Sequence, residues 1–258
     1  MSSQPDFSRE SYWHRTHPNW TVIGLDEAGR GPWAGPVVAG AAWIDPHARF
    51  DLPEGIGDSK TLTPRSREQL YQALVAQSKN GGGVRVATGI ASHQVIDDLG
   101  IIAATTQAMQ EAWQNLILPL AINPKDTMQN TGHNTTQNTR QNKSAGTIFL
   151  LDGPLALPVG KDDTIAVIDP QVRGDKRILS IAIASIVAKV VRDHHMHMLA
   201  KEYPQYGWEK NKGYGTAAHA QALARHGVSP YHRKSFRPCA DMCYNRQGKS
   251  TSKSVVTE

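Results

Sequence analysis

The stretch TVIGLDEAGRGP, residues 21–32, decides the class of fold. It opens with an apolar, β-branched run typical of a buried strand and ends in two carboxylates followed by a glycine-rich segment. Runs of the same kind predict strands at 21–25, 37–44, 84–90, 147–151 and 164–168. Helical patterns occur at 64–77, 96–118 and 179–203. Early strands followed by an alternation of strands and helices predict an α/β fold with a mixed sheet flanked by helices.

Two of the predicted strands end in acidic residues. Asp26 and Glu27 follow the run TVIGL, and Asp152 follows TIFLL. Strand ends of an α/β sheet open onto the crevice in which such folds bind ligands. Each aspartate could equally be a turn former, because Asp is favoured in turns before glycine. Together the two strand ends indicate a shared site only weakly.

The predicted helix at 179–203 contributes another acidic residue. Its segment from Ile181 to Val191 is apolar nearly all round, which predicts burial. The polar residues recur every four positions and therefore share one face. They are Ser185, Lys189, Asp193 and His197. Such a stripe either faces a polar network in the interior or contains a surface ion pair between Lys189 and Asp193.

These acidic positions together predict a metal site. Several carboxylates close to one another cannot all ionise unless a cation compensates them. Mg²⁺ prefers oxygen ligands, and a pair of such ions supports phosphoryl displacement. The predicted ligands are Asp26, Glu27, Asp152 and Asp193.

Six motifs, in order along residues 20–238, resemble those of ribonuclease HII, the type 2 ribonuclease H. The first is D-E-A-G-R-G-P at 26–32, continued by A-G-P-V-V-A-G-A at 34–41. The others are D-S-K at 58–60, L-L-D-G at 150–153, G-D-K at 174–176, S-I-A-I-A-S-I-V-A-K-V-V-R-D at 180–193 and Y-P-Q-Y-G-W-E-K-N-K-G-Y-G-T at 203–216. This resemblance implies an RNase H-like fold with a helical C-terminal extension.

The resemblance also implies an activity. The family hydrolyses the RNA strand of RNA–DNA hybrids and cuts 5′ to single ribonucleotides in duplex DNA, leaving 3′-hydroxyl and 5′-phosphate ends. Mg²⁺ or Mn²⁺ is the implied cofactor, and the four family carboxylates are matched to Asp26, Glu27, Asp152 and Asp193. A monomer is expected.

Further residues are implied to bind substrate. Gly29, Arg30 and Gly31 match the motif whose backbone approaches the ribose 2′-hydroxyl, the group that separates RNA from DNA. Tyr214 matches a tyrosine that stacks on the next sugar. The implied phosphate and backbone contacts are Lys60, Lys176, Ser180, Ser185, Lys189 and Lys212. Two positions depart from the family pattern, because Asn211 stands where His is usual and Ile183 where Ala is usual.

The charge of the chain is unevenly distributed. Of a formal net charge of +5, the whole excess lies in residues 199–258, with ten Lys and Arg against four Asp and Glu. A solvated tail gives this pattern as readily as a phosphate-binding face does. Given the resemblance, we expect a grip on the duplex backbone that does not read sequence. The residues assigned to this grip are Lys210, Lys212, Arg225, Arg233, Lys234 and Arg237.

The expected organisation is an N-terminal arm (1–19), an RNase H-like catalytic domain (20–198), a basic C-terminal extension (199–244) and a flexible tail (245–258). Within the catalytic domain, residues 124–147 are rich in Asn and Thr and read as a low-complexity insertion. No apolar run reaches the ~20 residues of a membrane helix, and the start lacks the apolar core of a signal peptide. We therefore expect a cytoplasmic protein without membrane association.

Three other classes compete with this reading. Ribonuclease HIII commonly has Gly-Lys-Gly where this chain has Gly-Arg-Gly, and it carries an additional N-terminal domain. A non-catalytic nucleic-acid-binding protein would be favoured by loss of a metal carboxylate. Another RNase H-like nuclease, such as a junction resolvase, would not require the combination of Gly29–Gly31 with Tyr214.

Overall fold

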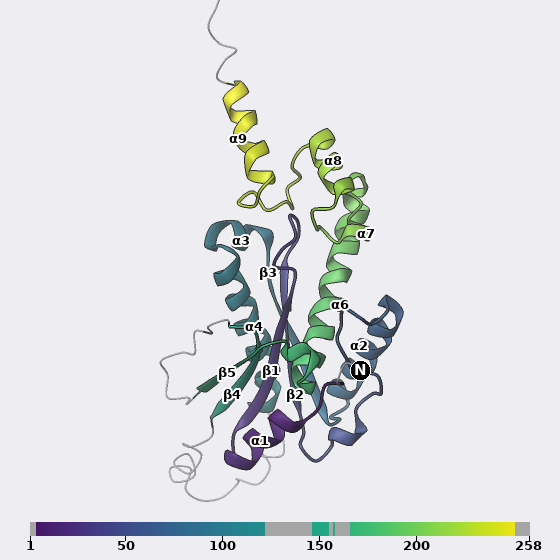
Figure 1. The fold of residues 1–258 in the computed structure, drawn as a ribbon, viewed down its shortest axis with the longest axis vertical. Helices are drawn as coiled ribbons and strands as arrows, with labels where there is room; N and C mark the ends of the chain where they lie inside the picture. The colour runs from purple at the N-terminus through teal and green to yellow at the C-terminus, as the bar shows by residue number, and fades with distance from the viewer. Residues whose placement is uncertain (1–3, 122–145, 155–156, 158–165, 251–258) are drawn as a thin grey trace, which may run out of the picture. The chain divides into compact units, whose positions relative to one another are not determined.

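The computed structural model describes residues 4–121, 146–154, 157 and 166–250 (Figure 1). The chain divides into two compact units. The first comprises the segment up to Ala28 with Val38–Ile90 and Thr106–Val190, and the second comprises Gly29–Val37, Ala91–Thr105 and the chain from Val191 onward. The Asn-rich segment predicted as an insertion lies outside the described residues, apart from its last two positions.

A five-stranded mixed sheet forms the first unit's centre, in the order β3-β2-β1-β4-β5. Its strands are β1 (Thr21–Ala28), β2 (Val37–Ile44), β3 (Val84–Ala91), β4 (Thr147–Asp152) and β5 (Ala166–Gln171). β1 runs antiparallel to β2 and parallel to β4, and β4 runs parallel to β5. The predicted α/β class with a mixed sheet is confirmed. The fifth predicted strand, at 164–168, is described from Ala166 and continues to Gln171.

Three of the described helices begin at a residue whose side chain caps the first turn. They are α1 (Ser8–Thr16), α2 (Pro64–Lys79), α3 (His93–Leu99), α4 (Ile101–Ala121), α6 (Leu179–Glu202), α7 (Trp208–Asn211), α8 (Ala217–His226) and α9 (Cys239–Ser250). Thr63 caps α2, its side chain accepting the amide of Ser66, with Pro64 at the first helical position. The prediction of a single helix over 96–118 is wrong. Gly100 adopts a φ of 81° and separates α3 from α4.

Helix α6 lies directly against the sheet in the first unit (Figure 1). Two glycines permit this approach, because a Cβ on Gly24 would lie 2.6 Å from the nitrogen of Ile181, and one on Gly40 would overlap the carbonyl of Ala184. The predicted burial of the apolar segment is confirmed, since residues 181–188 are all buried. Alternation along β1 puts Val22, Gly24 and Asp26 on one sheet face, and Gly24 shows that α6 covers it. Asp26 therefore lies on the side of the sheet that α6 covers.

The segment expected as an N-terminal arm is a helix docked on the first unit. Its Arg9 Nε and Trp13 Nε1 both donate to Asp169 Oδ2, each over 2.7 Å. Glu10 is 1% exposed and accepts the amide of Ser180 in the first turn of α6 over 2.8 Å. This carboxylate takes up one of the amides that a helix start leaves without a partner.

The second unit has its own apolar core. Ala34, Met196, Ala200, Tyr206 and Trp208 form this cluster. Among its helices, α9 continues to Ser250 and so includes the first residues of the predicted tail. The sequence patterns did not predict α1, α7, α8 or α9. None of the helices in the described ranges has the length and apolarity needed to cross a membrane.

Candidate metal centre and substrate loop

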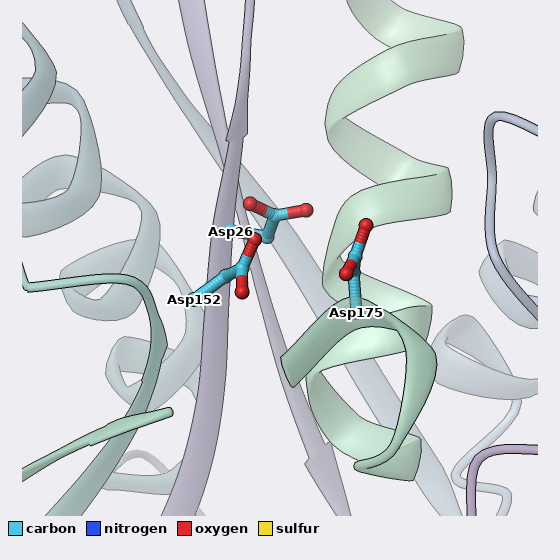
Figure 2. Close-up of side chains that lie close together, drawn as sticks. All are labelled: Asp26, Asp152 and Asp175. Carbon is cyan, nitrogen blue, oxygen red and sulfur yellow. The ribbon is translucent and has the colours of Figure 1, made fainter. Parts of the chain in front are cut away.

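Three carboxylates of the first unit meet at one point. The side chains of Asp26, Asp152 and Asp175 each offer an oxygen, and these atoms lie within 4.8 Å of one another. Figure 2 shows them pointing toward one another, two from the sheet and one from the turn before α6. Asp26 lies near the end of β1, Asp152 ends β4, and Asp175 lies in the 3-10 turn η3 (Gly174–Lys176). The parallel pairing of β1 with β4 brings the first two together.

Main-chain amides hold two of these carboxylates in place. The amide of Gly174 donates to Asp152 Oδ1 over 2.7 Å, and that of Glu27 donates to Asp26 Oδ1 over 2.8 Å. Each bond restricts the rotation of its carboxylate.

Side chains complete the surroundings. A hydrogen bond from Ser185 also reaches Asp26, and the Ser185 hydroxyl lies 2.9 Å from that of Ser59. Lys60 Nζ donates to Asp175 Oδ2 over 2.9 Å. The predicted polar stripe of α6 thus does begin in an interior polar network, at Ser185.

The electrostatics of this group favour a cation. Burial, and then the negative charge of Glu27, raise the pKa of Asp26 well above its usual range, and Asp152 adds to the effect. Burial also raises the pKa of Asp152. A bound divalent ion would reverse this penalty, because it stabilises the ionised carboxylates. All the donors are carboxylate oxygens and Asp26 and Asp175 are buried, so the set suits a hard divalent ion such as Mg²⁺ or Mn²⁺.

The group differs from the predicted ligand set at two positions. Asp26 and Asp152 come together as expected, but the third member is Asp175, which the sequence analysis did not assign as a ligand. Glu27 is not a member, although its negative charge is near enough to raise the pKa of Asp26. Asp193 is not a member either, and it belongs to the second unit. The signal for Asp175 was its place between Gly174 and Lys176 in a motif already quoted for the family.

The predicted phosphate contacts of the first unit differ in exposure. Lys60 and Lys176 have side chains 70% and 49% exposed, and they pair with Asp175 and Asp58 respectively. Ser180 is 1% exposed and Ser185 is 4% exposed. Their burial argues against direct phosphate contact by these two hydroxyls. Lys189 is half-buried on α6.

In the second unit the predicted 2′-hydroxyl motif forms an exposed loop. Arg30 and Gly31 are exposed, whereas Gly29 is buried with a φ of 98°. Tyr214 is 45% exposed and lies beside the loop, since a Cβ on Gly31 would be 3.9 Å from its Cε1. The predicted association of this glycine motif with Tyr214 is therefore present in the structure.

The turn before Tyr214 is held by the residue that departs from the family pattern. Asn211 accepts the amide of Gly213 on Oδ1 over 2.8 Å and donates from Nδ2 to the carbonyl of Tyr206 over 2.8 Å. Lys212 has a φ of 50°, and its ammonium binds the carbonyl of Glu209 over 2.8 Å. Asn211 thus has a structural role that requires no titration.

One residue assigned to the basic grip is wrongly placed there. Arg233 is fully buried, and its guanidinium donates to main-chain carbonyls of the loop that contains the glycine motif. A side chain without exposed surface cannot contact a phosphate. Sequence position alone did not separate Arg233 from its exposed neighbours Lys234 and Arg237.

A family model and a curated bacterial relative indicate the same family. The family model described as Ribonuclease HII matches residues 23–150 and 157–239. The ribonuclease HII of Rickettsia massiliae is 41% identical over 228 residues, which cover 88% of this chain and 96% of the relative.

Two solved structures share the fold. The ribonuclease H2 of Pyrococcus horikoshii OT3 has a TM-score of 0.59 at 22% identity, covering 88% of this chain and 99% of that one. Bst-RNase HIII in complex with Mn²⁺ has a TM-score of 0.59 at 17% identity, covering 89% and 71%. At these identities the structures establish the RNase H-like fold alone. The extent of the family match and the close bacterial relative show that the chain belongs to the ribonuclease HII family.

Proposed function

We propose that this ribonuclease H, which acts on the RNA of RNA–DNA substrates, cuts on the 5′ side of a ribonucleotide by a reaction that uses two metal ions. The products would carry 3′-hydroxyl and 5′-phosphate ends. The observation that carries the proposal is the convergence of Asp26, Asp152 and Asp175 at the ends of two parallel strands and the turn before α6. Such a group of buried oxygen donors is typical of enzymes that hydrolyse phosphodiesters.

The proposed ligands of the ions are Asp26, Asp152 and Asp175, with Glu27 beside them. Asp193 stays a predicted ligand from the family resemblance. Mg²⁺ and Mn²⁺ both suit the donor set, and the related fold of Bst-RNase HIII has been solved with Mn²⁺. Bound ions would supply an activated water and stabilise the leaving oxygen of the scissile phosphate.

The residues of the chain position the substrate. The exposed backbone at Arg30 and Gly31 offers amides to the ribose 2′-hydroxyl, and the ring of Tyr214 stacks on the neighbouring sugar. The ammonium groups of Lys60 and Lys176 are exposed enough to bind backbone phosphates. We expect the enzyme to act as a monomer in the cytoplasm.

The decisive experiment uses a DNA duplex that contains one ribonucleotide. We expect the wild type to cut 5′ to it with Mg²⁺ or Mn²⁺ and to leave the all-DNA duplex intact. Asp26→Asn should lower kcat/KM by roughly 10³ or more, because it removes a charged ligand. Gly29→Leu should also impair cutting, because a Cβ on Gly29 would overlap the side chain of Arg192.

Two outcomes would count against the proposal. Full activity of Asp26→Asn would show that the acidic group does not hold the catalytic ions. Equal cutting of the all-DNA duplex would show that the 2′-hydroxyl is not recognised. Mapping the new termini with a phosphatase and a ligase identifies the product ends.

A further inference from the structure

Two arginines of the second unit are buried, and no carboxylate in the described part of the chain pairs with them. Arg192 is 1% exposed and Arg233 is fully buried. Within the residues that the structure describes, neither guanidinium forms an ion pair. Burying a charge without compensation costs free energy, and hydrogen bonds must replace the lost contacts with water. The partners in these hydrogen bonds show which part of the chain the two arginines position. All of these bonds go to main-chain carbonyls.

Arg233 binds the loop that contains the predicted 2′-hydroxyl motif. Its Nη2 donates to the carbonyl of Gly29 over 2.6 Å, and its Nη1 donates to that of Arg30 over 2.9 Å. The same guanidinium also binds the carbonyls of Gly35 over 3.0 Å and Pro36 over 3.1 Å. The planar fork of one arginine thus fixes both ends of the loop from Gly29 to Pro36.

The direction of these two carbonyls determines the direction of the next two amides of the loop. In a planar trans peptide the N–H points away from the C=O of the preceding residue. Since the carbonyls of Gly29 and Arg30 point at Arg233, the amides of Arg30 and Gly31 point away from it. Arg30 and Gly31 are the exposed residues of the loop. Consecutive amides pointing outward form a concave donor pair that suits a ligand oxygen.

Arg192 joins the same loop to the turn that leads to Tyr214. It donates from Nε to the carbonyl of Pro36 over 3.1 Å and from Nη2 to that of Lys212 over 3.0 Å. Its guanidinium carbon lies 5.7 Å from the centroid of the Tyr214 ring. Gly29 provides the space for this arrangement, because a Cβ there would overlap Arg192 Nε.

We propose that Arg192 and Arg233 are positioning residues that set the discrimination between ribonucleotide and deoxyribonucleotide, by fixing the amides of Arg30 and Gly31 and the ring of Tyr214. The inference rests on the proposed function, because it assigns those amides to the ribose 2′-hydroxyl. Neither arginine touches the substrate. Lysine can keep the charge in each place, but it lacks the planar fork that binds several carbonyls in fixed directions.

The test compares the binding of two duplexes. The KM is measured for a DNA duplex with one ribonucleotide, and the Ki is measured for the same duplex in all-DNA form as a competitive inhibitor. The ratio of Ki to KM reports discrimination, and it cancels changes that affect all nucleic acids equally. We expect Arg233→Lys and Arg192→Lys each to lower this ratio by about tenfold, because the donor amides lose their fixed direction.

A matched control is available in the first unit. Arg67 is also buried, at 7% exposure, and it also donates to main-chain carbonyls, those of Ser59 over 2.8 Å and Leu62 over 2.9 Å. Arg67→Lys should lower the melting temperature but leave the ratio at the wild-type value. The Mn²⁺-induced rise in melting temperature should persist in all three variants, since none replaces a proposed metal ligand.

The possible outcomes separate the claims. The inference is overturned if folded Arg233→Lys and Arg192→Lys, judged by circular dichroism, both keep the wild-type ratio. It is also overturned if Arg67→Lys lowers the ratio as much, because the effect would then follow from general destabilisation. A ratio of one in the wild type would instead contradict the proposed function, and the inference with it.

Discussion

Two largely buried clusters of like charge occur among the residues that the structure describes, and the chain compensates them differently. In the first unit, Asp26, Asp152 and Asp175 gather three carboxylates, and the contacts described for them come from three main-chain amides, one serine and Lys60. In the second unit, Arg192 and Arg233 bury two guanidinium groups that donate seven hydrogen bonds to main-chain carbonyls. The cationic cluster is therefore satisfied by the chain itself.

The acidic cluster keeps an excess of negative charge. Burial and neighbouring carboxylates raise the pKa of Asp26, which means that the folded chain without a cation resists its ionisation. A charged cluster whose hydrogen bonds are all supplied by the chain can hold a loop in one conformation. A cluster whose charge the chain does not neutralise favours the binding of an ion of opposite charge. The contrast supports the proposals that the carboxylates hold the metal ions and that the two arginines position the substrate loop.

The largest loss of activity is expected from replacing the third metal ligand, for which Asp175 and Asp193 are the two candidates. Asp175→Asn should lower kcat/KM by roughly 10³ and remove most of the Mn²⁺-induced rise in melting temperature, because it takes a charge from the cluster. Asp193→Asn should have a smaller effect on both measurements. The reverse order would return Asp193 to the metal site and reduce Asp175 to the partner of Lys60.

When no metal is bound, titratable groups of the two units should change the stability of the protein in opposite directions as the pH changes. Asp26 and Asp152 have raised pKa values, so their contribution to stability is present in acid and is lost as pH rises through those values. Burial lowers the pKa of His232 from 6.5 to about 3 and lowers that of His219 as well. Their contribution is therefore present above about pH 6.5 and is lost as pH falls toward 3.

Melting temperatures in EDTA between pH 4 and 8 test this opposition. Asp26→Asn removes a carboxyl that stabilises the folded protein at low pH. The melting temperature of this variant should therefore fall more steeply on acidification than that of the wild type. His232→Asn should fall less steeply. We expect the curves to diverge by about 2–4 °C, the shift that ~1 kcal/mol gives in a chain of this size. Parallel curves for all three proteins would contradict the assignment of these groups.

The smallest effect is expected for a segment that belongs to neither cluster. Deletion of residues 126–145, within the Asn- and Thr-rich segment, should leave kcat/KM and melting temperature nearly unchanged. The cost of closing a loop varies slowly with its length, and the segment contains little apolar surface to bury. A large loss of either quantity would show that the segment contributes to folding or to the site.

The sequence predicted the sheet and two members of the acidic cluster, because both depend on local patterns. Alternating and β-branched runs located the strands, and the carboxylates at their ends follow directly. Asp175 was not predicted as a ligand because it lies in a 3-10 turn of three residues, which is too short to give a periodic sequence pattern. Asp193 was predicted because an acid that follows an apolar helical segment is unusual, and it stays a predicted ligand outside the group of three carboxylates.

The arginine cluster could not be read from the sequence for a related reason. Arg233 stands between His232 and Lys234 in a basic region, and such a pattern is typical of a surface. Its burial depends on carbonyls about 200 positions earlier in the chain. Arg192 did give a signal, since it follows directly on an apolar helical segment, but the signal concerns burial and does not identify the groups that it binds.

The docking of α1 has a consequence for folding during synthesis. Glu10, Arg9 and Trp13 leave the ribosome early, yet their partners Ser180 and Asp169 are made more than 150 residues later. At ~5–20 residues per second, the first helix waits roughly 8–35 s for its docking site. During that interval the Trp13 ring and the Glu10 carboxyl remain available to chaperones. Helix α1 is therefore made long before the residues against which it docks, and it covers the start of α6 once it does.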